Sequence, residues 1–228
     1  SAEQGKVMLG RFGWKAGEPR IRQQNAHAFN GDIGISTPLT PSASGDCTAR
    51  QTRCLKAPTG DSAEFDNLEA PRKVTDLVLF YSRNLAVPAR RGIADSDVLA
   101  GKKLFYESGC TACHKPKFIT RTGNAQPEQS RQLIWPYTDM LLHDMGNGLA
   151  DNRPEGRANG REWRTPPLWG VGLTEAVSGH TQFLHDGRAR TLLEAILWHG
   201  GEAEKSRTAV INMLTRQREN LLKFLNSL

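Results

Sequence analysis

The chain has 228 residues, of which 38% are apolar, and this is enough to build the core of one large or two small domains. Its 30 Lys and Arg residues and 24 Asp and Glu residues give a net charge of +6, but the basic residues are scattered and no nucleic-acid-binding motif accompanies them. Because no apolar run approaches the roughly 20 residues of a membrane-spanning helix, we expect neither a nucleic-acid partner nor a membrane span.

The first part of the chain is poor in regular structure. Residues 1–70 are rich in Gly, Pro, Ser, Asn and Thr, as in "FNGDIGISTPLTPSASGD", which predicts mostly loop with one or two short helices. Residues 72–86 place Val74, Leu77 and Phe80 near helical spacing before Pro88, and this predicts a helix. We expect residues 1–94 to be an irregular segment that packs on the domain that follows.

The second part, residues 95–228, shows helical patterns at both of its ends. Asp95 or Ser96 can cap a helix that leads into a pair of cysteines, and the apolar spacing of residues 207–227 predicts a terminal amphipathic helix. Two shorter helices are predicted over 137–145, inside a long loop region, and over 191–201, where two glycines end the pattern. Alternating strand patterns do not persist, so the predicted fold is mostly α.

The stretch "ESGCTACHKPKF" holds the motif with the clearest chemistry. In C-x-x-C-H, Cys110 and Cys113 lie one helical turn apart and can form thioethers with the two vinyl groups of a haem, while His114 binds the iron from below. We therefore predict one covalent haem c and a cytochrome c-like haem domain.

Three other readings of this motif are open. A zinc site lacks the usual second cysteine pair nearby, and a thioredoxin-like dithiol lacks a preceding strand. The third is a chance occurrence in a structural module without haem. The short helix predicted before the motif favours the interpretation as a haem c site.

Covalent haem implies an exported, oxidising setting, most often the bacterial periplasm. In such a compartment Cys47 and Cys54 are predicted to form a disulfide that stabilises a region with little hydrophobic core. No signal segment opens the chain, so we expect any export signal to have been removed already.

The ligand on the other face of the iron decides between electron transfer and catalysis. Six side chains are candidates by residue type: His143, His180, His185, His199, Met145 and Met213. We favour His199, which ends an apolar helix just before Gly200 and Gly201, whose missing side chains would let a flat macrocycle approach. Met145, in a turn-like context, is the second choice, and Met213 fits core packing better.

Long stretches of the chain resemble a known family. "GCTACHKPKF", "IWPYTDMLLHDMGNGLAD" and "REWRTPPLWGVGLTEAVSGHTQFLHDGRARTLLEAILWHGGEA" are similar to sequences of the di-haem oxidoreductase, putative peroxidase family of bacterial c-type cytochromes. The stretch from "RTPPLWG" onward is more distantly similar to bacterial di-haem cytochrome c peroxidases and to the methylamine dehydrogenase maturation enzyme. His199 stands where these relatives place a methionine or a tyrosine, so the resemblance implies axial ligation by His114 and His199.

The resemblance also implies roles for neighbouring residues. Trp163 and Arg164 would serve the haem propionates, and His185 and Trp198 would lie at the haem edge. Thr165 and Pro167 match residues that help hold a calcium ion between two domains, so calcium is a further expected cofactor.

Members of this family usually carry another C-x-x-C-H motif before the region that matches here, and this chain has none. We therefore expect a C-terminal haem domain that delivers single electrons, with a redox partner protein or an N-terminal haem domain of the same protein as its partner. The alternative is a peroxidase or related oxidoreductase acting directly at this haem, with Asp144, His143 or His185 as the acid-base group.

Overall fold

The structure of the protein is a computed structural model that describes residues 1–123 and 126–228. It divides into two compact units, Ser1–Ala86 and Val87–Leu228. Helices account for most of its regular structure, and each strand has only two or three residues, so the expectation of a mostly α chain is met. Within the described ranges, every helix falls short of the length and apolar character that crossing a membrane requires.

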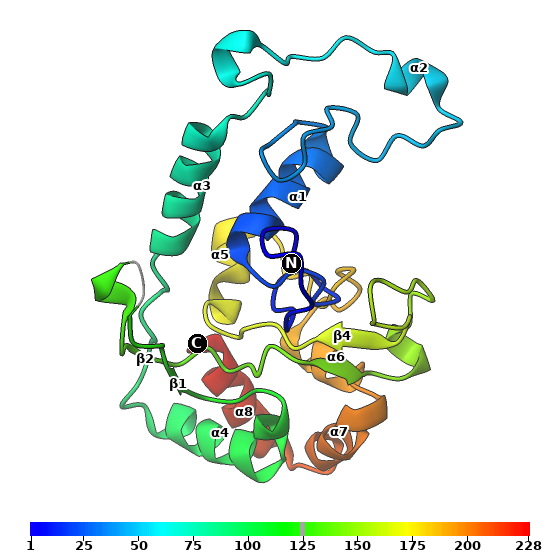
Figure 1. The fold of residues 1–228 in the computed structure, drawn as a ribbon. Helices are drawn as coiled ribbons and strands as arrows, with labels where there is room; N and C mark the ends of the chain where they lie inside the picture. The colour runs from blue at the N-terminus through cyan, green and yellow to red at the C-terminus, as the bar shows by residue number, and fades with distance from the viewer. Residues whose placement is uncertain (124–125) are drawn as a thin grey trace. The chain divides into compact units, whose positions relative to one another are not determined.

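The first unit is built on a pair of helices, α1 (Ile21–Ile33) and α3 (Arg72–Asn84), which pack together (Figure 1). α1 is longer than the short helices expected here, and Gly34 ends it in the left-handed region at φ 73°. α3 matches the predicted helix. Between them the chain is mostly irregular, with the single-turn helix α2 (Thr52–Leu55) and one turn of 3₁₀-helix at Ala63–Phe65. The predicted disulfide between Cys47 and Cys54 is present in this irregular stretch.

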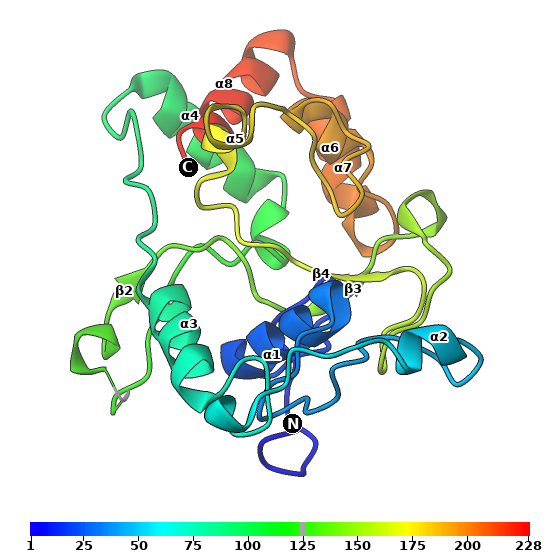
Figure 2. The ribbon, with the colours of Figure 1, turned by 90° about the horizontal axis from the view of Figure 1, so that it is seen from above.

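The core of the second unit lies where two helices that are far apart in the sequence pack together. α4 (Ser96–Glu107) packs along α8 (Thr215–Asn226), and both views of the ribbon place them side by side (Figures 1 and 2). A Cβ on Gly101 of α4 would lie 1.9 Å from the carbonyl oxygen of Asn220, so only glycine permits this close approach. The buried core of the unit consists of Val98, Phe105, Tyr137, Val210, Leu221, Phe224, Leu225 and Leu228.

In the part of this unit that the structure describes, four short strands form two antiparallel pairs. β1 (Phe118–Ile119) pairs with β2 (Leu133–Ile134), and β3 (Leu142–Asp144) pairs with β4 (Glu162–Arg164). The second pair places His143 opposite Trp163. The remaining helices are α5 (Thr174–Ser178), α6 (Leu192–Leu197) and α7 (Glu204–Ile211).

The helix predicted over 137–145 is wrong. Tyr137 and Met140 have φ values of 52° and 61°, which no right-handed helix accommodates, and β3 takes up the end of the segment. The backbone of β4, which comes later in the sequence, supplies the hydrogen-bonding partners of β3.

The single helix predicted over 207–227 is instead two helices, α7 and α8, with a break at residues 212–214. Arg218 donates through Nη1 to the carbonyl oxygens of Ile211 and Met213, and Gln217 accepts from the Leu214 backbone N–H. These side chains satisfy backbone groups that a continuous helix would have paired internally.

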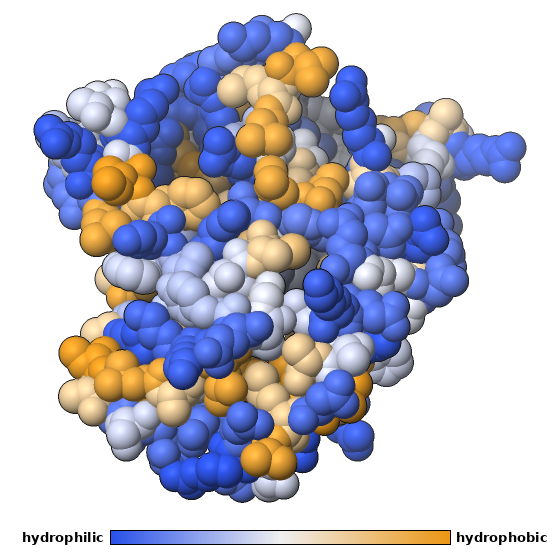
Figure 3. All heavy atoms as spheres, turned by 90° about the horizontal axis from the view of Figure 1, so that it is seen from below, coloured by the Kyte–Doolittle hydropathy of each residue, from blue (hydrophilic) through white to orange (hydrophobic). Residues whose placement is uncertain are grey.

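Apolar side chains also reach the surface in several separate patches, with hydrophilic side chains between them (Figure 3). On α3 the exposed apolar residues include Leu77, at 62% exposure, and Phe80, at 60%.

Candidate haem site

The C-x-x-C-H motif forms a tight turn directly after α4. Gly109 takes the left-handed conformation at φ 81°, and Cys110–Ala112 form one turn of 3₁₀-helix. The backbone N–H of His114 donates to the carbonyl oxygen of Cys110 at 2.9 Å. Cys110 and Cys113 are both free thiols, one turn apart as the spacing predicts.

The imidazole of His114 is partly buried and has a fixed orientation. Its Nδ1 lies 2.9 Å from the carbonyl oxygen of Tyr137, and since a carbonyl only accepts, Nδ1 carries the proton. Burial lowers the pKa of His114 to about 4. At neutral pH the ring is therefore neutral, and Nε2 keeps the lone pair with which it can bind a metal.

His199 has the same arrangement. Its Nδ1 donates to the carbonyl oxygen of Ala195 at 2.7 Å, one turn back along α6, and burial lowers its pKa. The two rings are near enough for the charge of His199 to contribute to the lowered pKa of His114.

These residues fit a c-type haem with two axial imidazoles. Two free thiols stand beside a neutral imidazole, and a second neutral imidazole is in electrostatic range of the first. A backbone carbonyl fixes the tautomer of each ring, so each presents Nε2 as its available donor atom.

The segment from Tyr137 to Gly146 runs between the two histidines. Tyr137 supplies the carbonyl that holds His114, and at the other end Gly146 lies against the backbone after His199. A Cβ on Gly201 would lie 2.2 Å from the carbonyl oxygen of Asp144. The space left by this glycine is therefore filled by backbone, and not by a macrocycle as we expected.

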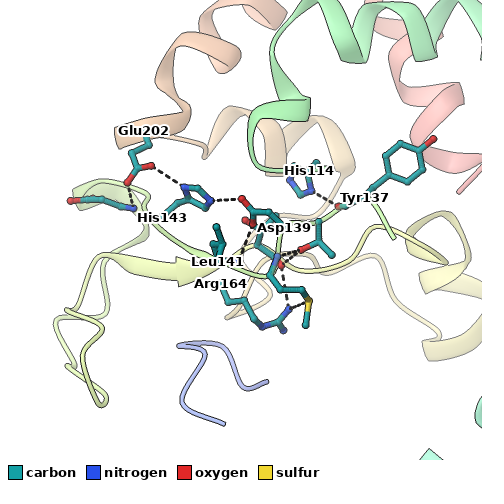
Figure 4. Close-up of polar contacts among 11 residues, drawn as sticks. His114, Tyr137, Asp139, Leu141, His143, Arg164 and Glu202 are labelled. Atoms are coloured by element: carbon teal, nitrogen blue, oxygen red, sulfur yellow. Dashed lines mark hydrogen bonds and ion pairs between the residues drawn. The ribbon is translucent and has the colours of Figure 1, made fainter. Parts of the chain in front are cut away.

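A chain of three polar side chains lies beside the motif (Figure 4). His143 Nε2 is 2.9 Å from a carboxylate oxygen of Asp139, and His143 Nδ1 is 2.8 Å from a carboxylate oxygen of Glu202. Burial opposes the charge of His143, but the two carboxylates outweigh it and raise the pKa of the imidazole. The pKa values of Asp139 and Glu202 are lowered.

Sequence reasoning identified His143 but missed its two partners. Asp139 lies within the segment wrongly predicted as helix, and no pattern in the sequence links residues 139 and 143 to Glu202. The link depends on the turn after His199 lying against β3.

Trp163 and His185 form a stacked pair. Their ring centroids are 3.5 Å apart with an interplanar angle of 13°, and the Trp163 indole N–H donates to the carbonyl oxygen of Leu149 at 2.9 Å. The indole N–H thus has a partner within the protein, and the expected donation from Trp163 to a propionate stays a prediction. His185 Nε2 also lies 3.8 Å from a carboxylate oxygen of Asp186.

Arg164 and Thr165 follow at the end of β4. Arg164 is half-buried, which lowers the pKa of its guanidinium, and its Nη1 donates to the Thr165 carbonyl oxygen at 3.2 Å. That oxygen also accepts from the Thr138 hydroxyl at 2.6 Å, so a calcium ion bound there would have to displace these donors. The expected calcium roles of Thr165 and Pro167 and the propionate role of Arg164 stay predictions.

The other candidates from the sequence are spread around the site. Trp198 is partly exposed, with the Arg188 guanidinium 5.0 Å from its ring. His180 is exposed and Met213 packs against the core. The backbone of Met145 lies beside Gly200, next to His199, so it stays the second choice for the axial position.

Comparison with known proteins bears on the whole chain. A family model described as "di-haem oxidoreductase, putative peroxidase" matches residues 2–228. No curated protein and no solved structure matches the chain. The family name speaks of two haems, whereas the sequence holds one C-x-x-C-H motif, at residues 110–114. The chain belongs to the di-haem oxidoreductase family.

Proposed function

We propose that this chain carries one covalent haem c and transfers one electron at a time, as the electron-delivery half of a di-haem oxidoreductase. The observation that carries the proposal is the matched pair of partly buried imidazoles, His114 and His199, each held at Nδ1 by a backbone carbonyl. Two strong-field nitrogen ligands close both axial positions of a haem iron, and an iron without an open position serves electron transfer better than catalysis.

In this proposal each residue of the site has a defined task. Cys110 and Cys113 tether the porphyrin edge through thioethers, and His114 and His199 bind the metal. A bound haem supplies reversible one-electron chemistry at its iron. The protein keeps both imidazoles neutral by burial and fixes their tautomers through the carbonyls of Tyr137 and Ala195.

The test begins with the full chain produced together with a c-type cytochrome maturation system. Intact mass should show one porphyrin adduct, and the visible spectrum should be that of a low-spin, six-coordinate haem. His199→Ala should convert this spectrum to a high-spin one, while His185→Ala, which changes a stacked histidine nearby, should leave it low-spin. Absence of the adduct would overturn the proposal, and an unchanged spectrum in His199→Ala would pass the axial role to Met145.

A second candidate function is peroxide chemistry directly at this haem. The observation in its favour is the Asp139–His143–Glu202 chain, which holds an imidazole between two carboxylates in a partly buried position. Of the other acid-base candidates, Asp144 is paired with Arg161 at 3.0 Å and His185 is stacked on Trp163. This function requires a high-spin resting spectrum and peroxidase turnover that His143→Ala abolishes.

The setting we propose is a bacterial periplasm or another exported compartment. The Cys47–Cys54 disulfide supports it, since such bonds persist in oxidising compartments. The net charge of +6 supports an acidic redox partner protein, and the family supports a haem domain of the same protein as the other partner. Calcium would be a further cofactor at Thr165 and Pro167.

A further inference from the structure

The β1–β2 hairpin exposes apolar side chains on one of its faces. Ile119 pairs with Leu133, so their side chains lie next to each other on the same face, 72% and 56% exposed. Lys117, just before β1, and Trp135, just after β2, continue this face, because side chains alternate along a strand. Trp135 is 41% exposed. The hairpin therefore presents large apolar groups to the solvent.

Positive charge surrounds the indole of Trp135. The ammonium nitrogens of Lys102, on α4, and Lys117 lie 5.4 and 5.6 Å from the centroid of its ring. Within the described ranges neither lysine is paired with a carboxylate. The neighbouring residues 115–121 and 131–137 include further basic side chains and no acidic one. What we call the Trp135 face consists of Lys102, Lys117, Ile119, Leu133 and Trp135.

The Trp135 face lies at the surface end of a short connection to His114. Trp135 is followed by Pro136 and then by Tyr137, whose carbonyl oxygen accepts from His114 Nδ1 at 2.9 Å (Figure 4). The rings of Trp135 and Tyr137 have their centroids 6.4 Å apart, and Tyr137 is buried. Two peptide units and one hydrogen bond thus join an exposed indole to a proposed iron ligand.

We propose that the Trp135 face is the docking surface for an acidic protein that donates single electrons to this chain. This inference rests on the proposed function and adds the place at which the donor binds. Leu133 and Trp135 would form the apolar centre of the contact, and the lysines would meet carboxylates of the donor at its rim. In the step, the donor is oxidised by one electron and the haem iron is reduced from ferric to ferrous, with no bond or proton exchanged.

The charge pattern favours a separate acidic protein over the other occupants of such a face. Two copies of this chain joined here would bring their lysines together, and like charges across an interface disfavour association. An anionic membrane would attract the lysines, but it holds no redox centre to use the connection through Tyr137. Complementary charge speeds the encounter of two proteins that must meet and separate at each electron transfer.

The kinetic experiment uses the haem-loaded full chain and reduced plant-type ferredoxin, a strongly acidic one-electron carrier of low potential, as the probe. Stopped-flow mixing at low ionic strength gives the second-order rate constant of the electron transfer. The double variant Lys102→Glu, Lys117→Glu should react about 10- to 100-fold more slowly than wild type. The difference should shrink with added salt, since the Debye length falls from about 30 Å at 0.01 M to about 3 Å at 1 M.

A matched control separates local charge from net charge. The double variant Lys56→Glu, Lys73→Glu makes the same change of net charge at two exposed lysines of the first unit, and it should slow the reaction far less. Dithionite, a small reductant that needs no docking surface, should reduce wild type and both double variants at similar rates. Equal slowing of the two double variants with ferredoxin would overturn the proposal.

Binding is measured apart from electron transfer, with both proteins oxidised. Zero-length carbodiimide cross-linking to ferredoxin, followed by peptide mapping, should join its carboxylates to Lys102 and Lys117. Trp135→Ala keeps both lysines and should weaken binding roughly 10-fold or more, since a tryptophan at the centre of an interface carries much of its affinity. Phe80→Ala, which removes an exposed aromatic ring of α3, is the control and should bind as wild type.

Other occupants of the face give other results. Cross-links confined to other lysines, or undiminished binding in Trp135→Ala, would overturn the proposal. So would a dimer of the chain in light scattering that Trp135→Ala breaks, or binding to phosphatidylglycerol vesicles through these lysines without a ferredoxin cross-link. The proposed function fails differently, by a missing porphyrin adduct on intact mass. A loaded, low-spin chain that dithionite reduces and ferredoxin reaches by another face counts against this inference alone.

Discussion

His114 and His199, the two proposed iron ligands, are each oriented by a single hydrogen bond to the backbone. Each ring makes a hydrogen bond through Nδ1 to a backbone carbonyl, of Tyr137 in one case and Ala195 in the other. Burial keeps both rings neutral. Tyr137, which supplies one of these carbonyls, takes a left-handed backbone conformation at φ 52°.

This arrangement predicts how the haem-free chain responds to acid. The pKa of His114 falls from its ordinary value of 6.5 to about 4 in the fold, so the unfolded chain binds the extra proton first. Stability should therefore fall as the pH drops from about 6.5 toward about 4, by about 3 kcal/mol from this residue. Urea unfolding at pH 7 and pH 4.5 measures the effect. The His114→Leu variant should lose this part of the difference in unfolding free energy between the two pH values. An equal difference in wild type and variant would contradict the prediction.

For single residues of the site, the sequence was informative where the chemistry requires a fixed spacing between them. Cys110, Cys113 and His114 are predicted from one motif because thioether attachment requires that spacing, and His199 is predicted from its place at the end of an apolar helix. As haem-binding residues all four stay predictions. Asp139 and Glu202 did not follow from any pattern. Glu202 meets His143 and the Asp144 backbone across 59 and 58 positions, and contacts so far apart leave no local signature. Asp139 lies only four positions before His143, but in a segment whose backbone the sequence predicted wrongly.

Among the elements, the crossing of α4 and α8 depends on one missing side chain. Gly101→Ala would place a Cβ 1.9 Å from the Asn220 carbonyl oxygen, and we expect it to lower the free energy of unfolding by about 1 to 3 kcal/mol or more. Gly31→Ala in α1 is the matched control, since its Cβ would have its nearest neighbour at 3.9 Å. Alanine there should be neutral or stabilise by up to about 1 kcal/mol. Chemical unfolding of both variants tests the contrast, which equal effects would refute.

The start of α4 offers a second test. One Asp95 carboxylate oxygen accepts from the backbone N–H groups of Asp97 and Val98, at 2.7 and 3.2 Å, so of the two caps that the sequence allows, Asp95 or Ser96, it is Asp95 that caps the helix. Asp95→Ala should cost about 1 kcal/mol of stability. Asp95→Asn keeps an acceptor oxygen and should cost much less. If both substitutions cost the same in thermal or urea unfolding, the cap does not act as described.

Local sequence patterns predict some of the helices and strands but not others. α3, α4 and the α6 region follow from apolar spacing and end signals, because those signals are local. The apolar residues of 137–145 fit helical spacing equally well, yet positive φ values at Tyr137 and Met140 and pairing with β4 make this segment extended. The break between α7 and α8 has no Gly or Pro to announce it. It depends on side-chain bonds from Gln217 and Arg218.

At the scale of the whole chain, the two units have separate sources of stability. The buried cluster around α4 and α8 lies entirely within the second unit, whereas the first has the Cys47–Cys54 disulfide. Replacing both cysteines by serine should destabilise the first unit by about 2 to 3 kcal/mol.

Hydrogen exchange can locate the effect of this double substitution. Amides of α1 should exchange faster, while those of α4 and α8 should be unaffected. Uniform acceleration across the chain would show that the two units unfold together, and it would contradict the prediction.

The stretch from Tyr137 to Met145 contacts the surroundings of both proposed ligands, through the Tyr137 carbonyl at one end and the closely packed glycines after His199 at the other. If the two imidazoles hold a haem as we propose, inserting or deleting one residue in this stretch should change their separation, and with it the coordination of the iron, without altering either ligand.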